Sequence, residues 1–397
     1  MPVLNRAADM KDEIAALRRE LHQNPQTAYE EEFASNLIAQ KLTEWGISFK
    51  RGYATTGIVA TIEGQSSQSG KTIGLRADID ALDIIEKSGQ PWASKTPGKM
   101  HGCGHDGHTA ILLGTAKYLQ ETKNFDGKVH LIFQPAEEGG RGADKMIEDG
   151  LFNDFPCDSV YGLHNWPGLP LGRMETRVGP LMANVDEFVI EITGKGGHAA
   201  MPDKTIDPAI CAAQLVTALQ TIVSRNASPV EPLVVSVTNI NVGTGAFNVI
   251  GDSAKLTGTV RSFSEDMRQF ARKRIEEICA GIGATFGAKV EMTEFIFGTD
   301  ATINTEAETH FAASCAAKIL GADNVSTKAD LCMGGEDFGS FLKVKPGAYV
   351  FMGQGTKQAS PHNHGLHSPF YDFNDDLIPI GMSYFSALVE EAMPLKK

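Results

Sequence analysis

The sequence predicts an α/β protein in which a smaller α+β domain interrupts a larger α/β domain. The chain has 397 residues, enough for two or three domains. Apolar strand-like runs alternate with amphipathic helical patterns, as in a largely buried sheet covered by helices. In the middle of the chain the order changes to β-α-β-β-α-β, which is typical of a split βαβ (ferredoxin-like) sandwich.

The larger domain consists of segments whose apolar residues repeat with a helical or a strand period. In the first helix Ile14, Leu17 and Leu21 share one face, and an Asn-Pro pair ends the pattern. A Gly/Ser-rich stretch over 64–70 separates two strands and predicts a hairpin between them. Further helices are expected over 30–45, 109–119, 143–148, 307–320 and 378–393, and strands over 58–62, 72–77, 129–133, 159–163 and 348–352.

The inserted domain begins where strict apolar/polar alternation replaces continuous apolar runs. Asp207 is a good N-cap and Pro208 a good first helical residue, so a helix opens there. We expect this domain over 184–296, with 1–183 and 297–397 forming one discontinuous larger domain. Its predicted strands cover 186–193, 233–240, 255–263 and 289–295, and its helices 208–223 and 264–282.

The composition argues against several classes of function. Lys and Arg number 36 against 49 Asp and Glu, which gives a net charge of −13, so neither nucleic acid nor an anionic membrane is an expected partner. No apolar run approaches the ~18 residues of a membrane helix, and the charged first segment does not resemble an export signal. Six scattered cysteines do not form a disulfide scaffold. A cytoplasmic location is therefore expected.

The densest chemical signal is the segment HGCGHDGH over 101–108. Imidazole and thiolate bind Zn²⁺, Mn²⁺, Co²⁺ or Ni²⁺ to varying degrees, and the interleaved glycines let the backbone curl around an ion. The segment is expected in a loop before a helix, where ligands of α/β proteins gather. The alternative is a polar loop whose histidines cap that helix.

Two adjacent carboxylates, Glu137 and Glu138, follow an apolar strand. Successive side chains leaving a strand can point in different directions, so one can bind a metal while the other reaches a water. A divalent metal lowers the pKa of water towards ~7, and a nearby glutamate can take its proton. His164 and His367 are further candidate ligands, although a lone histidine in such a place is more often structural.

Four other polar residues are candidates for orienting a ligand or the substrate. Asp78 ends a strand and is expected to orient a metal ligand. His198 is flanked by glycines and suits donation to a developing oxyanion, while Arg261 suits a substrate carboxylate. Asn248 lies between these two in the sequence. The acidic turn 334–337 receives no ligand role, and each of these residues also fits a purely structural position.

Together and in this order, these segments resemble the M20 metallopeptidase family. The resemblance is to its amidohydrolase branch, which includes hippurate hydrolases, N-acyl-amino-acid amidohydrolases and auxin-conjugate hydrolases. It covers nearly the whole chain. The matching motifs are RADIDAL (76–82), HGCGHDGHTA (101–110), QPAEEG (134–139), GLH (162–164), GGHAA (196–200), MGGEDF (333–338) and HSP (367–369).

The resemblance implies a zinc-exopeptidase-like catalytic domain with a ferredoxin-like insertion that serves as lid and dimerisation domain. It also implies two divalent ions (Mn, Zn, Co or Ni). Cys103 would bind both ions, His105 and His164 would complete one set of ligands, and Glu138 and His367 the other. A homodimer or homotetramer formed through the inserted domain is expected.

The catalytic roles implied by the resemblance centre on Glu137, the general base on a metal-bridging water. His198 would reach into the site of the partner subunit and stabilise the oxyanion, and Asp78 joins the catalytic group. Asn248 and Arg261 fall where family members hold the substrate. The implied reaction cleaves an N-acyl amino acid, a small molecule, into a carboxylic acid and a free amino acid.

Two positions depart from the wider family pattern. Arg76 stands where that pattern has a metal-binding histidine, and Cys103 where many members have a bridging aspartate. Both features are usual in the amidohydrolase branch and argue against a typical aminopeptidase. A metallo-dipeptidase or carboxypeptidase, an N-acetyl-diaminopimelate deacetylase and a carbamoyl-amino-acid hydrolase stay open. So do a thiol hydrolase with Cys103 as nucleophile and a metal-storing dimer without activity.

Overall fold

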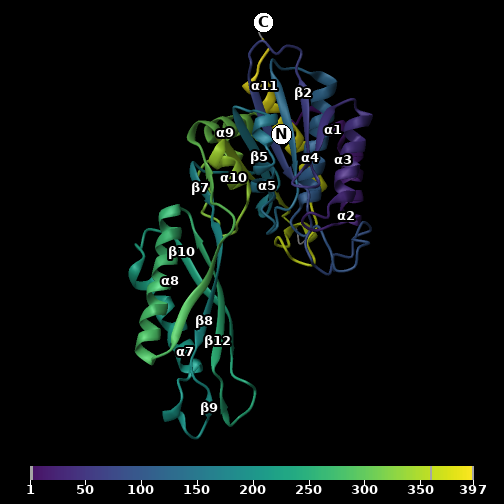
Figure 1. Ribbon diagram of the computed structural model, residues 1–397. Coiled ribbons are helices and arrows are strands. Elements are labelled where there is room, and N and C mark those ends of the chain that lie inside the picture. Colours follow the sequence, from purple (N-terminus) through teal and green to yellow (C-terminus); the bar gives the residue numbers. More distant parts are fainter. Residues whose placement is uncertain (1–2, 358–359, 396–397) are drawn as a thin grey trace. The chain divides into compact units, whose positions relative to one another are not determined.

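The computed structural model describes residues 3–357 and 360–395, and contacts within the chain divide it into two units. Each unit has its own buried apolar core. The limits 184–296 of the inserted domain stay a prediction. The contacts also assign Leu331–Glu336, a short segment that is separate in the sequence, to the smaller unit. The larger unit comprises Met1–Leu181, Thr302–Asp330 and Asp337–Lys397, and the smaller unit Met182–Ala301 and Leu331–Glu336 (Figure 1).

The larger unit contains an eight-stranded sheet in the order β1-β2-β4-β3-β5-β16-β6-β15. Strands β4, β3, β5 and β16 are parallel neighbours in its middle. Most of their residues are buried, as expected for parallel strands covered by helices. The bounds are β1 Ser48–Tyr53, β2 Gly57–Glu63, β3 Thr72–Asp78, β4 Lys128–Gln134, β5 Ser159–Pro170, β6 Met174–Glu175, β15 Val325–Ser326 and β16 Gly347–Gly355.

Helix α4 is the central helix of this unit and is buried along most of its length. It packs against α2, α11 and β3, which explains why it is apolar on nearly all sides (Figure 1). The helices are α1 Asn5–Asp9, α2 Lys11–Gln23, α3 Glu32–Glu44, α4 His105–Thr122, α5 Gly142–Glu148, α6 Leu151–Asp154, α9 Glu306–Leu320, α10 Phe338–Val344 and α11 Ile378–Ala392.

Three sequence predictions about this unit are wrong. Strands β2 and β3 do not form a hairpin, because β4 lies between them and β2 pairs with β1 instead. The sequence predicts no strand at β1, whose side chains are mostly exposed and lack apolar alternation. The histidine-rich segment is also not all loop, since α4 begins at His105 and includes His108 in its first turn.

The smaller unit contains a four-stranded antiparallel sheet in the order β10-β12-β8-β13. Helices α7 and α8 pack against it, and along β8 buried residues alternate with more exposed ones. This arrangement matches the predicted β-α-β-β-α-β order. The bounds are β8 Asn184–Thr193, β9 Gly197–His198, α7 Pro208–Thr221, β10 Leu233–Val242, β11 Val249–Ile250, β12 Ser253–Ser262, α8 Glu265–Phe286 and β13 Lys289–Phe297.

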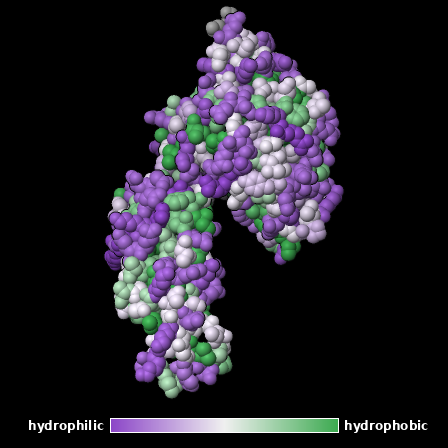
Figure 2. All heavy atoms as spheres, viewed as in Figure 1, coloured by the Kyte–Doolittle hydropathy of each residue, from purple (hydrophilic) through white to green (hydrophobic). Residues whose placement is uncertain are grey.

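Several large apolar side chains of the smaller unit lie exposed to solvent, and Figure 2 shows hydrophobic patches on its surface. Four of them belong to the end of edge strand β10 and the following loop and strand: Ile240, Val242, Phe247 and Val249. Within the described residues, every helix is too short or too polar to cross a lipid bilayer.

Candidate metal centre

The predicted ligands lie at the carboxyl edge of the parallel strands of the larger unit. Strand β3 ends at Asp78, β4 leads into Glu137 and Glu138, and β5 contains His164. Parallel strands end at the same edge of a sheet, so these side chains meet there. The first turn of α4 and the loop that carries His367 complete the cluster.

Among the described residues, five groups of three side chains hold their donor atoms within 4.8 Å of one another, and two of these groups contain Cys103. The first group adds His105 and His164, and the second adds Glu138 and His367. Cys103 Sγ lies 3.4 Å from His164 Nε2, and Glu138 Oε1 lies 3.1 Å from His367 Nε2. The structure therefore brings together the five residues that the family resemblance implied as ligands.

The orientation of the His105 ring is fixed by an aspartate that the sequence analysis did not single out. His105 Nδ1 lies 3.1 Å from both the carboxylate and the carbonyl of Asp80. Its other nitrogen, Nε2, is buried and has no hydrogen-bond partner among the described residues. It faces carboxylates, at 3.7 Å from Asp78 Oδ2 and 4.0 Å from Glu137 Oε2. A cation would satisfy this nitrogen and its acidic surroundings.

Asp78 is held from two sides and lies outside the two groups that contain Cys103, although its donor atom forms a further group with those of His105 and His108. Its Oδ1 lies 2.6 Å from His108 Nδ1, and its Oδ2 lies 2.7 Å from Arg76 Nη1. His108 Nε2 in turn lies 2.7 Å from Asn165 Oδ1. Because both ring nitrogens of His108 are engaged, His108 holds Asp78 in place. This geometry suits a positioning role for Asp78.

The negative charge around the cluster favours bound cations. Burial opposes protonation of His105, but Asp78 and Asp80 raise its pKa to about 10, so a positive charge is favoured there. Burial and the neighbouring His108 lower the pKa of His164 well below its usual value, which leaves a neutral imidazole. Thiolate, imidazole and carboxylate together are a donor set for Zn²⁺, Mn²⁺, Co²⁺ or Ni²⁺. The residues present therefore fit a pair of divalent ions.

Glu137 borders the ligand groups and retains some access to solvent, since its side chain is 10% exposed. Its Oε1 accepts a hydrogen bond from the backbone N–H of Asp337 at 3.4 Å. Its Oε2 faces the cluster. One oxygen is thus anchored while the other is directed towards the site, as a general base requires.

Unusual backbone conformations surround the cluster. Ala136 and His367 have positive φ angles of 56° and 65°, which is uncommon for residues with a side chain. The N–H of His367 donates to Gly102 O at 2.8 Å, which holds this conformation. Gly104 has φ of 91°, and a Cβ there would lie 2.4 Å from Asn165 Oδ1. Only glycine fits at that position.

The three candidate residues of the smaller unit lie in two separate places. His198 is exposed on β9, and the adjacent N–H of Ala199 donates to Asn248 O at 3.0 Å. These two residues lie beyond the Ser253 end of β12. Arg261 lies at the other end of that strand, half-buried, and donates to Val260 O at 3.1 Å. Within one chain, Arg261 thus lies at one end of the four-stranded sheet, and His198 lies beyond the other end, in the two-stranded sheet of β9 and β11.

Asp80 and His108 are the functional residues that sequence reasoning missed. The signal for Asp80 is its spacing from Asp78, because residues two apart at a strand end share a face. No comparable signal distinguishes His108 from His105, since both lie in one turn of the same helix.

This fold and these donors define the class of α/β metal-dependent hydrolases. The sequence profile of Peptidase family M20/M25/M40 matches residues 74–391, and the chain belongs to this family. The predicted family and the α/β class are confirmed, and the protein is a hydrolase of amide bonds.

Relatives resemble the chain over nearly its whole length. Hippurate hydrolase of Campylobacter jejuni is 38% identical over 388 residues, which cover 98% of each chain. N-acetyl-L-cysteine deacetylase of Bacillus subtilis is 41% identical over 379 residues, 95% of this chain and 87% of that one. A dinuclear metal binding peptidase of the M20 family from Bacillus subtilis has a TM-score of 0.83 at 34% identity, covering 97% and 99% of the two chains.

Proposed function

We propose that the protein is a metal-dependent amidohydrolase that cleaves N-acyl amino acids into a carboxylic acid and a free amino acid. The observation that carries this proposal is the pair of ligand groups that share Cys103, with Glu137 beside them. The relatives support the substrate class, because hippurate and N-acetyl-L-cysteine are both amino acids acylated on nitrogen.

In this proposal Cys103, His105 and His164 hold one ion, and Cys103, Glu138 and His367 hold the other. We propose Mn²⁺, Zn²⁺, Co²⁺ or Ni²⁺ for both positions, in keeping with the mixed donors. Ions of this kind lower the pKa of water and polarise a carbonyl oxygen.

The side chains of the site have the remaining catalytic and positioning roles. Glu137 takes the proton of the attacking water and passes it to the leaving amine. Asp80 fixes the His105 ring by holding Nδ1, and Asp78 lies beside Nε2 of the same ring. His198 of the partner subunit donates to the oxyanion, and Asn248 of the partner subunit, together with Arg261 of the chain that holds the ions, binds the substrate.

A homodimer or homotetramer formed through the smaller unit belongs to the same proposal. If His198 and Arg261 serve one substrate molecule, we expect them to come from different subunits, because in one chain Arg261 lies at one end of the four-stranded sheet and His198 lies beyond the other end. Strand β10 offers an unpaired edge with exposed Ile240 and Val242, which suits pairing with a second copy. The cytoplasmic location is proposed on the ground of the cysteine content.

The environment of Cys103 argues against its use as a nucleophile. Burial, followed by the charges of Glu138 and Glu137, raises the pKa of this thiol well above its usual value. A protonated, buried thiol attacks poorly, whereas a bound cation would favour the thiolate.

Hydrolysis of a small panel of compounds tests the proposed function. N-acetyl and N-benzoyl amino acids and a dipeptide are incubated with chelated protein before and after Mn²⁺, Zn²⁺, Co²⁺ or Ni²⁺ is returned. We expect hydrolysis to stop on chelation, to return with metal and to favour the N-acyl amino acids. Hydrolysis that survives chelation but not thiol alkylation would identify a thiol hydrolase, and a preference for the dipeptide would identify a peptidase.

A further inference from the structure

A buried ion network beside the ligand cluster has no part in the mechanism described so far. It centres on Arg18 of α2, whose side chain is fully buried. The guanidinium donates to Asp375 Oδ1 at 2.8 Å, to Asp372 Oδ1 and Phe373 O at 3.4 Å, and to Asp106 Oδ2 at 3.5 Å. One cation therefore compensates three carboxylates from two distant parts of the chain.

His22, one turn further along α2, contacts the same carboxylate. Its Nδ1 donates to Asp106 Oδ2 at 2.8 Å, and its Nε2 donates to Glu86 Oε1 at 3.3 Å. Arg18 and His22 are four residues apart and share one face of the helix. Helix α2 thus holds Asp106 with two side chains at once.

The residues that α2 contacts lie close to the proposed ligands in the sequence. Asp106 directly follows His105 in the first turn of α4. The acceptors at 372–375 belong to the segment that follows His367, and the two parts are joined where the N–H of Tyr371 donates to Ser368 O at 3.0 Å. The turn of α4 and this segment are in contact, since a Cβ on Gly107 would lie 2.2 Å from the Phe373 ring.

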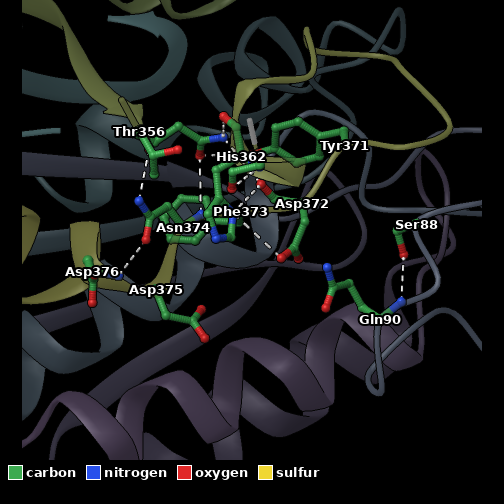
Figure 3. A network of polar contacts seen from close by, with 12 residues as sticks. Ser88, Gln90, Thr356, His362, Tyr371, Asp372, Phe373, Asn374, Asp375 and Asp376 are labelled. Carbon is green, nitrogen blue, oxygen red and sulfur yellow. Dashed lines mark hydrogen bonds and ion pairs between the residues drawn. The ribbon is translucent and has the colours of Figure 1, made fainter. Parts of the chain in front are cut away.

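The segment after His367 is itself firmly anchored. His362 Nδ1 donates to Asp372 O at 3.2 Å, and Trp92 Nε1 donates to Asp372 Oδ1 at 3.0 Å. Asn374 Nδ2 donates to Gln354 O in strand β16 at 2.9 Å. Figure 3 shows this network, with Asp372 near His362 and with Asp375 and Asp376 further away. A displacement of Asp372 would therefore be transmitted along a stiff segment.

We propose that Arg18 and His22 are positioning residues of the two-ion centre. By holding Asp106 against the 372–375 segment, they set the separation of His105, a ligand of one ion, from His367, a ligand of the other. Without Arg18 the three carboxylates lose the cation that they share and repel one another more strongly, which moves these two ligands apart. This inference rests on the metal centre of the proposed function but not on the identity of the substrate.

Metal affinity tests the proposal directly, with no substrate present. Co²⁺ is titrated against a competing chelator into wild type, Arg18→Gln, Arg18→Lys, His22→Leu and His22→Asn, and cobalt–thiolate absorption reports binding at Cys103. We expect Arg18→Gln and His22→Leu to weaken the binding of at least one ion by roughly 10- to 100-fold. Arg18→Lys restores only part of this loss, because an ammonium lacks the planar fork that reaches several acceptors. His22→Asn keeps a donor near Nδ1 and stays close to wild type.

Arg19→Gln is the matched control. Arg19 also pairs with Asp375, at 2.8 Å, but its side chain is 43% exposed. We expect its metal affinity to equal that of the wild type.

The proposal would be overturned if Arg18→Gln and His22→Leu both bind metal with wild-type affinity and only the stability of the chelated protein falls. Arg18 and His22 would then have a purely structural role. If Arg18→Gln does not fold, the comparison of His22→Leu with His22→Asn decides in the same way. A wild type that binds two ions and hydrolyses no N-acyl amino acid would overturn the proposed function alone.

Discussion

At the scale of single residues, Glu137 has the most demanding role, with one oxygen anchored and the other directed to the ligand cluster. Glu137→Gln preserves its shape but cannot take a proton. We expect unchanged metal content and a kcat lower by roughly 100- to 10,000-fold, measured by metal analysis and steady-state kinetics. A variant with full turnover would rule out Glu137 as the base.

The proposed origin of His198 from the partner subunit predicts complementation between inactive variants. Glu137→Gln and His198→Ala are each inactive alone. In a mixed dimer one of the two sites has both residues intact, so random mixing should restore about a quarter of the wild-type activity. Mixing by denaturation and refolding, followed by the standard assay, measures this recovery. No recovery at all would place His198 in its own chain's site or outside catalysis.

His130 of β4 predicts a specific dependence of stability on pH. Burial lowers the pKa of His130 from 6.5 to about 4. Below pH 6.5 the unfolded chain binds a proton that the folded protein does not, so stability falls as the pH drops towards 4. The loss amounts to about 3 kcal/mol at most.

Urea unfolding at several pH values measures this loss. His130→Gln should remove that part of the pH dependence, whereas His310→Gln on the exposed face of α9 should leave it in place. Equal pH profiles for wild type and His130→Gln would contradict the assignment.

The site residues that could be predicted are those that stand in unusual combinations of metal-binding residue types. Cys103, His105 and the two glutamates stand in motifs that few structural roles explain. The division of labour between His105 and His108 was not predictable. It depends on which ring nitrogen meets Asp80 or Asp78, and those contacts bring together side chains 25 and 30 residues apart in the chain.

At the scale of elements, local periodicity predicted most segments but not their neighbours. The helices α2, α3, α9 and α11 were predicted because each repeats its apolar residues with a helical period. The wrong hairpin arose because pairing of strands is not a local property. Strand β4, which separates β2 from β3, follows them in the chain after the whole of α4.

At the start of α4, the addition of one methyl group to Gly104 is expected to destabilise the fold strongly. Gly104→Ala places a Cβ against Asn165 and Tyr371 at a backbone φ of 91°, whereas Gly150→Ala has nearly the same φ, 92°, and only an ordinary contact with Asn153 Nδ2 at 3.9 Å. The backbone strain, ~1–2 kcal/mol, is common to both variants. Crowding should cost Gly104→Ala a further ~1–3 kcal/mol. Denaturant unfolding of the chelated proteins compares the two, and equal losses would contradict the crowding.

At the scale of the whole molecule, all five proposed ligands belong to the larger unit, as do the three tryptophans, Trp45, Trp92 and Trp166. Metal bound to this unit should stabilise it alone. We expect chelation to lower the midpoint of thermal unfolding followed by tryptophan fluorescence by roughly 10 °C. The transition of the smaller unit, followed by calorimetry, should not move. A common shift of both transitions would show that the units unfold together.

The sheet order has a consequence for the growing polypeptide. Strand β16 pairs with β5, yet the entire smaller unit is translated between them. During that interval β5 has an open edge on the ribosome-bound chain, and open edges pair readily with other chains. Nascent chains stalled after residue 330 should therefore co-sediment with aggregates or chaperones, whereas chains stalled beyond the end of α11 should not. The inserted unit thus imposes a delay on synthesis during which the incomplete sheet needs protection.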